Sequence, residues 1–167
     1  MNKALFTFPS DTTLRMERVF PASGHNLWQA YADPAVLGQW FSPKGWDTEV
    51  YQHDFVEGGE FVYAMKCVDE AQDWFGQKSC GKMVFGKISP ETTFEYRDFF
   101  TDEEGVVNED MPSSHTQVTI TELGPNESKL TVETTYASAE ALQQVLAMGM
   151  EEGYGQTLDK LESLLSA

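Results

Sequence analysis

Six consecutive segments in the middle of the chain alternate apolar and polar residues as β-strands do, and only short turns separate them. The clearest segment, EFVYAMKC, places Phe61, Tyr63, Met65 and Cys67 on one face. Strands in series with short loops predict an antiparallel meander, because parallel neighbours need long crossover connections. The six predicted strands span residues 47–55, 60–67, 80–88, 92–100, 115–123 and 128–136.

One more strand and two short helices are predicted before this meander. The segment TLRMERVF at residues 13–20 alternates as a strand, and Pro21 ends it. Ser23 is placed as the N-cap of a first short helix, and Asp33-Pro34 marks the start of a second. Gly38 limits the second helix to one or two turns.

The last part of the chain has the pattern of a long amphipathic helix. From Ser138 onward, leucines such as Leu142 and Leu158 recur at helical spacing among charged residues. Three glycines, Gly149, Gly153 and Gly155, interrupt this pattern, and each costs about 1 kcal/mol relative to Ala in a helix interior. Either the helix breaks near residues 147–149, or the glycines allow a close approach to another element.

The order of these elements predicts a single two-layer α+β domain. We expect a curved antiparallel sheet of six or seven strands wrapped around the long C-terminal helix, with two short helices after the first strand. A chain of 167 residues is long enough for one domain with a real core. Residues 1–11 are predicted to be a loose leader, and residues 12–167 to form the domain.

The charge of the chain excludes two classes of partner. Its 27 acidic and 11 basic residues give a net charge of −16, which repels nucleic-acid backbones and anionic membrane surfaces. The sequence shows no apolar run of the ~20 residues that a membrane span needs, and no convincing signal peptide. We therefore expect a cytoplasmic protein. Reduced thiols are favoured over a disulfide for Cys67 and Cys80.

The sequence lacks the common motifs of catalytic and metal sites. The sequence has no GxSxG, P-loop or GxGxxG string, and its three histidines lack the spacing of a metal site. We expect no catalytic residue, metal or cofactor. Arg97 and Asp98 are adjacent on one predicted strand, so alternation turns one of them inward, where it would orient a ligand. We favour the alternative, an outward cross-strand pair.

Five local strings, in this order, resemble one known family. They are RVFPAS at 18–23, LWQAYADPAVLGQWFSPKGW at 27–46, DFVEGGEFVYAM at 54–65, GKISPETTFEY at 86–96 and GMEEGYGQTLDKLESLL at 149–165. The chain resembles the helix-grip fold of the START/Bet v 1-like (SRPBCC) superfamily. More narrowly, it is similar to the family related to the C-terminal domain of the activator of the heat-shock protein 90 ATPase. The resemblance covers roughly residues 14–165.

This resemblance implies a cavity between the sheet and the C-terminal helix. Trp40 and Phe41 would either line its mouth or plug the core, and both alternatives stay open. The ligand would be a small hydrophobic, aromatic or lipid-like molecule, with tyrosine hydroxyls and Arg97 as polar contacts. The candidate lining residues are Trp40, Phe61, Tyr63, Met65, Phe85, Tyr96, Met148 and Tyr154.

The resemblance leaves two other functions open. One is a co-chaperone-like module that binds a protein partner. The other is an enzyme similar to the polyketide cyclases and aromatases, which needs an inward acid, tyrosine or histidine. In every case the protein is expected to be a monomer or a homodimer. An apolar cavity favours ligand binding, an exposed apolar patch favours the module, and a buried titratable group favours the enzyme.

Overall fold

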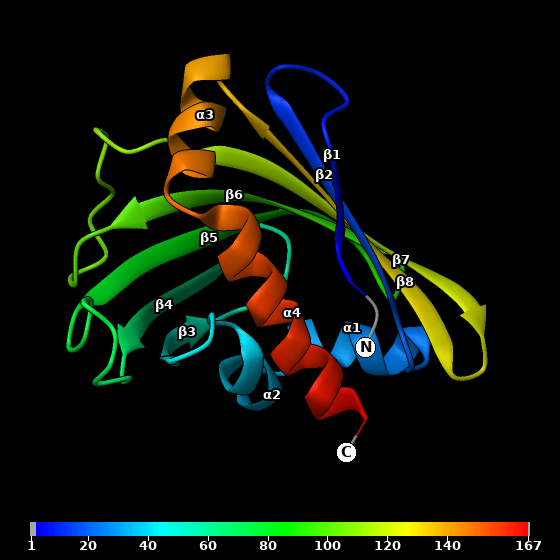
Figure 1. The fold of residues 1–167 in the computed structure, drawn as a ribbon. Helices are drawn as coiled ribbons and strands as arrows, with labels where there is room; N and C mark the ends of the chain where they lie inside the picture. Colours follow the sequence, from blue (N-terminus) through cyan, green and yellow to red (C-terminus); the bar gives the residue numbers. More distant parts are fainter. Residues whose placement is uncertain (1–2, 167) are drawn as a thin grey trace.

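The computed structural model describes residues 3–166 and shows two layers, a curved antiparallel sheet and a helical layer on its concave face (Figure 1). The strands are β1 (Leu5–Thr7), β2 (Thr13–Phe20), β3 (Trp46–His53), β4 (Glu60–Cys67), β5 (Lys78–Ser89), β6 (Thr93–Thr101), β7 (Ser114–Gly124) and β8 (Glu127–Tyr136). The helices are α1 (Gly24–Ala32), α2 (Pro34–Trp40), α3 (Ala139–Ala147) and α4 (Met150–Leu165). The predicted α+β fold is confirmed.

The strands are arranged in the order β1-β2-β8-β7-β6-β5-β4-β3. The predicted meander runs from β3 to β8, and β2 pairs with β8, so the first predicted strand lies beside the last one. The sheet has eight strands rather than six or seven, because residues 5–7 of the expected loose leader pair with β2. Phe6 packs against the core and holds this short edge strand in place.

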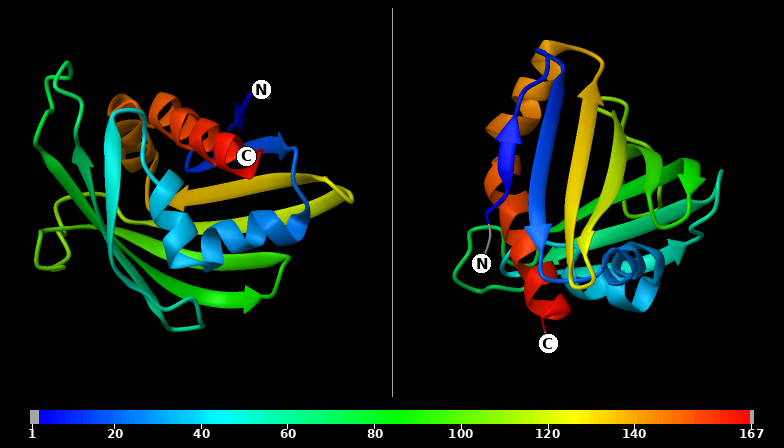
Figure 2. Two further views of the ribbon diagram at one scale, coloured as in Figure 1. Left: turned by 90° about the horizontal axis from the view of Figure 1, so that it is seen from below. Right: turned by 90° about the vertical axis from the view of Figure 1, so that its right-hand side faces the viewer.

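Register shifts bend the sheet around the helical layer. They occur between Val50 and Gln52 in β3 and between Phe85 and Ile88 in β5. At each shift one strand has one residue more than its partner, and such a β-bulge bends the strand and increases its twist. The sheet therefore curves around α4, with α3 near one end of that helix and α1 and α2 near the other (Figures 1 and 2).

The two short helices begin at the predicted caps. Ser23 Oγ accepts a hydrogen bond from the backbone N–H of Asn26, and Asp33 Oδ1 accepts one from that of Ala35. These bonds satisfy backbone donors that a helix N-terminus leaves unpaired.

Aromatic side chains fill the end of the fold beneath α1 and α2. Trp40 is fully buried, and its indole N–H donates to the Ala30 carbonyl at 3.0 Å. Its ring meets those of Tyr31 and Phe41 edge to face at 5.0 and 5.6 Å. Trp40 therefore plugs this end of the core, which decides between the two alternatives for that residue.

The predicted long C-terminal helix is broken at Gly149, so a break near residues 147–149, rather than a close approach to another element, explains this glycine. Gly149 has a φ of 83° and separates α3 from α4. Residues with a Cβ rarely adopt this left-handed conformation.

Two alanine substitutions in this region are expected to act in opposite directions. Gly149→Ala lowers the free energy of unfolding by about 1 kcal/mol, because alanine is strained at this φ. Gly155→Ala raises it by about 0.5–1 kcal/mol, because the helix gains propensity and the new Cβ meets nothing within 4 Å. Urea denaturation measures both changes, and effects of the same sign would contradict the assigned break.

Candidate ligand-binding cavity

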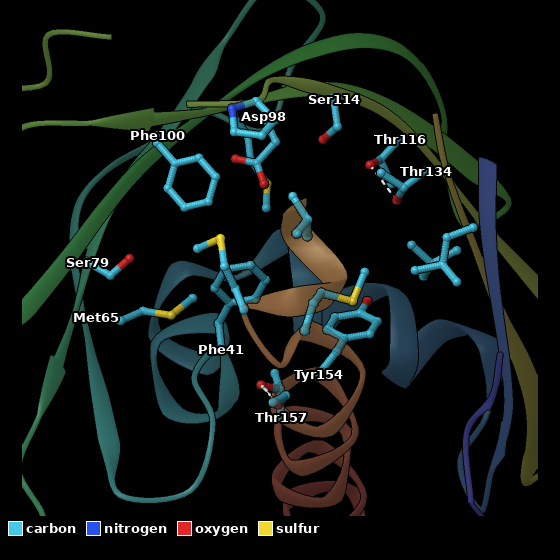
Figure 3. Close-up of a pocket in the computed structure, with 18 of the residues that line it drawn as sticks. Phe41, Met65, Ser79, Asp98, Phe100, Ser114, Thr116, Thr134, Tyr154 and Thr157 are labelled. Atoms are coloured by element: carbon cyan, nitrogen blue, oxygen red, sulfur yellow. Dashed lines mark hydrogen bonds between the residues drawn. The ribbon is translucent and has the colours of Figure 1, made fainter. Parts of the chain in front are cut away.

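A cavity of about 350 Å³ lies between the concave face of the sheet and the start of α4, and the packed rings around Trp40 lie beyond Phe41 at one end of it. Its floor comes from the strands β1, β2, β4, β5, β6, β7 and β8, and its opposite wall comes from the junction of α3 and α4 and from the start of α4. Met148 is 56% exposed at this junction. Figure 3 shows side chains from both layers pointing into the space.

Five of the eight candidate lining residues lie in the cavity wall: Tyr63, Met65, Tyr96, Met148 and Tyr154. The other three, Trp40, Phe61 and Phe85, lie in the packed core instead. Alternation gave the correct face for Phe61 and Phe85, but both lie toward the plugged end of the sheet. Phe41, the neighbour of Trp40, does line the cavity.

The pair Arg97 and Asp98 is not an outward pair. Asp98 lines the cavity, two residues after Tyr96 on the same face of β6, whereas Arg97 is exposed on the other face. The charged contact inside the cavity is therefore Asp98 and not Arg97. Its spacing from Tyr96 was the signal in the sequence that could have identified it.

Few hydrogen bonds stabilise the charged form of Asp98. Tyr63 donates its hydroxyl hydrogen to Asp98 Oδ1 over a long distance of 3.4 Å. Burial raises the pKa of Asp98 to about 7, while the hydrogen bonds from Tyr63 and from the backbone of Phe99 act in the opposite direction. A carboxyl group with this pKa exchanges its proton near neutral pH.

Neutral hydroxyl groups make up much of the remaining polar surface of the cavity. Burial raises the pKa of Tyr136 and of Tyr154 to about 12, so both hydroxyls keep their protons at neutral pH. Thr116 and Thr134 share a hydrogen bond of 2.9 Å across β7 and β8 (Figure 3). Thr157 donates to the backbone carbonyl of Gly153.

The cysteines and histidines of the described residues do not form a metal site. Cys67 and Cys80 are free thiols, on β4 and β5 respectively. His53 Nε2 lies 2.8 Å from the Tyr31 carbonyl, and burial lowers the pKa of this imidazole. Within residues 3–166, no group of three or more His, Cys, Asp or Glu side chains is placed to hold a metal ion. Nor does this part of the chain contain a helix long and apolar enough to cross a membrane.

The curved sheet around a C-terminal helix, with a cavity between them, defines a helix-grip protein of the START/Bet v 1-like superfamily. Residues 21–166 match the sequence model of the family described as "Activator of Hsp90 ATPase homolog 1-like protein". The chain belongs to this family.

Solved structures agree with this assignment. Protein Ms6760 from Mycobacterium smegmatis is 34% identical, with a TM-score of 0.87 and 98% of each chain covered. A protein from Arthrobacter aurescens is 27% identical, with a TM-score of 0.87 over 97% of this chain and 91% of that one. One from Staphylococcus epidermidis is 25% identical, with a TM-score of 0.80 over 95% and 92%. No curated protein matches the chain.

Proposed function

We propose that the protein binds a small, mainly apolar molecule in the cavity between the sheet and α4. The cavity itself is the observation that carries this proposal. Its volume of about 350 Å³ falls within the range of about 300–1,000 Å³ typical of ligand sites. Its wall combines apolar side chains with a few polar groups, as such sites usually do.

The α3–α4 junction fits an adaptable entrance. Met148 and Met150 flank Gly149 in the cavity wall, and methionine side chains fill irregular spaces well. The tyrosines opposite supply hydroxyl groups that orient a ligand.

Filling the cavity is expected to abolish binding. Thr134→Phe places a ring in the space and weakens the binding of N-phenylnaphthylamine, an uncharged fluorescent dye, by at least about tenfold. A fluorescence titration measures the affinity, and circular dichroism checks that the variant is folded.

Thr121→Phe is the matched control, because Thr121 is exposed on β7 and lies outside the cavity wall. It is expected to bind the dye as the wild type does. Failure of the wild type to bind saturably, or equal binding by folded Thr134→Phe, would overturn the proposal.

Asp98 favours a second candidate function, that of an enzyme similar to the polyketide cyclases. A carboxyl group whose pKa is near 7, next to the Tyr63 hydroxyl, is suited to general acid–base catalysis. The test is the loss of water from a poly-β-ketone, followed by mass spectrometry. Equal rates for the wild type and Asp98→Asn would exclude this role for Asp98.

An exposed apolar group is compatible with a chaperone-like protein partner. Val68, Trp74 and Phe75 are 45%, 57% and 53% exposed and lie close together in sequence between β4 and β5.

The two free thiols suit the cytoplasmic location that we propose, where thiols are kept reduced.

A further inference from the structure

Among residues 3–166, Asp98 is the only charged side chain in the cavity wall. Within the part of the chain that the structure describes, the wall contains no lysine, arginine or histidine. The other titratable groups there are the thiol of Cys80 and the hydroxyls of four tyrosines, Tyr63, Tyr96, Tyr136 and Tyr154. Burial raises the pKa of each of these groups, so all of them are uncharged at neutral pH.

The carboxylate of Asp98 has no cationic partner of its own. No ion pair joins it to a lysine or arginine within residues 3–166. Arg97, its neighbour in sequence, lies on the opposite face of β6 and is exposed. A carboxylate in an apolar space is costly unless a cation or strong donors compensate it.

The surroundings of Asp98 suit a cation. Figure 3 shows its carboxyl group pointing into the cavity, Phe100 shares its face of β6, and the rings of Phe41 and Tyr154 line the opposite side. Aromatic faces attract cations. The net charge of −16 also favours the approach of a cation over that of an anion.

We propose that the ligand of this cavity is an apolar amine, bound as a cation with its ammonium group hydrogen-bonded to Asp98. The inference rests on the proposed ligand-binding function and names the class of ligand. The hydrocarbon part of the amine lies against the aromatic rings and methionines, while the ammonium group supplies the missing partner of the carboxylate. Carboxylate ligands such as fatty acids are disfavoured above about pH 7, because there they meet the ionised Asp98 and no cation in the wall.

The proposal predicts a pH dependence. Asp98 loses its proton near pH 7 in the free protein, and an alkyl amine stays protonated well above this pH. The affinity for the amine therefore rises roughly tenfold from about pH 6 to about pH 8, as the fraction of ionised Asp98 increases. An uncharged ligand shows no such rise.

Three naphthalene probes with one substituent at the same ring carbon test this inference: naphthylmethylamine, naphthylmethanol and naphthoate. At pH 8 the wild type is expected to bind the amine about ten- to hundredfold more tightly than the alcohol, the range of a charge-assisted hydrogen bond. The carboxylate is expected to bind most weakly. Displacement of N-phenylnaphthylamine or calorimetry gives the affinities.

Two variants complete the test. Asp98→Asn keeps the shape of the side chain and is expected to remove the preference for the amine while leaving the alcohol nearly unaffected. Glu95→Gln removes one carboxylate from the opposite face of the same strand and is expected to behave as the wild type.

The outcomes separate this inference from the function on which it rests. Equal binding of amine and alcohol by the wild type, or a preference that survives in Asp98→Asn, would overturn the amine assignment and leave a cavity for neutral ligands. Failure of every naphthalene probe and of the dye to bind would overturn both proposals.

Discussion

Asp98→Asn is expected to raise the free energy of unfolding by about 2–4 kcal/mol at pH 8. The wild-type protein must hold an ionised carboxylate in the cavity at this pH, and burial makes ionisation harder there than in the unfolded chain. Asparagine has nearly the same shape and carries no charge. Asp98 is only half-buried, so screening by solvent keeps the effect toward the lower half of this range.

The sign of the pH dependence follows from the two pKa values. Asp98 has a pKa of about 7 in the folded protein, against an ordinary value of 3.8. Between these values the folded state binds more protons than the unfolded state, so the contribution of Asp98 to stability falls as the pH rises. The advantage of Asp98→Asn therefore grows from about pH 4 to about pH 7 and is constant above that.

Chemical denaturation at several pH values from about 5 to 9 measures the difference in free energy of unfolding between Asp98→Asn and the wild type. Other titrating groups contribute equally to both proteins, so their contributions cancel. Glu95→Gln is the control, and its difference from the wild type is expected to stay small throughout. A stability gain of Asp98→Asn that is independent of pH, or a loss at pH 8, would show that the pKa of Asp98 is not raised in the folded protein.

Trp40→Ala is expected to lower the free energy of unfolding by about 3–5 kcal/mol, the range for removing a buried tryptophan. Trp40 is fully buried, and its removal leaves a large void among the rings of Tyr31 and Phe41. It also leaves the Ala30 carbonyl without the indole donor. Urea denaturation and thermal melting measure the loss.

Trp74→Ala makes the same substitution at a side chain that is 57% exposed, and it is expected to change stability by less than about 0.5 kcal/mol. Similar costs at the two positions would contradict the assignment of Trp40 to the core. A folded Trp40→Ala protein that loses only ligand affinity would instead return Trp40 to the cavity wall.

Much of the fold could be predicted from the sequence because its signals are local. Each signal depends only on residues nearby in the sequence. This holds for the alternation of the strands, for the turn residues and for the helix caps Ser23 and Asp33. β1 was not predicted, because three residues are too few to show a period and its pairing with β2 is a tertiary contact. Gly149 marked the end of α3, but composition alone did not distinguish a break from a close approach.

The residues of the cavity wall were harder to predict, because they are set by the position of a residue along its strand as well as by the face it occupies. Tyr63 and Phe61 share a face of β4, yet one lines the cavity and the other packs in the core. Asp98 was missed because solvated pairs of opposite charge are the usual interpretation of adjacent residues such as Arg97 and Asp98. Only the packed structure shows which side of the sheet is hollow.

A carbon-13 NMR titration of the Asp98 carboxyl group, in the free protein and with saturating naphthylmethylamine, tests the amine assignment most directly. We expect a midpoint near pH 7 in the free protein and a clear fall in that midpoint when the amine is bound, because a neighbouring cation favours the carboxylate. A midpoint near 4 in the free protein, or a midpoint that the bound amine does not move, would contradict this assignment.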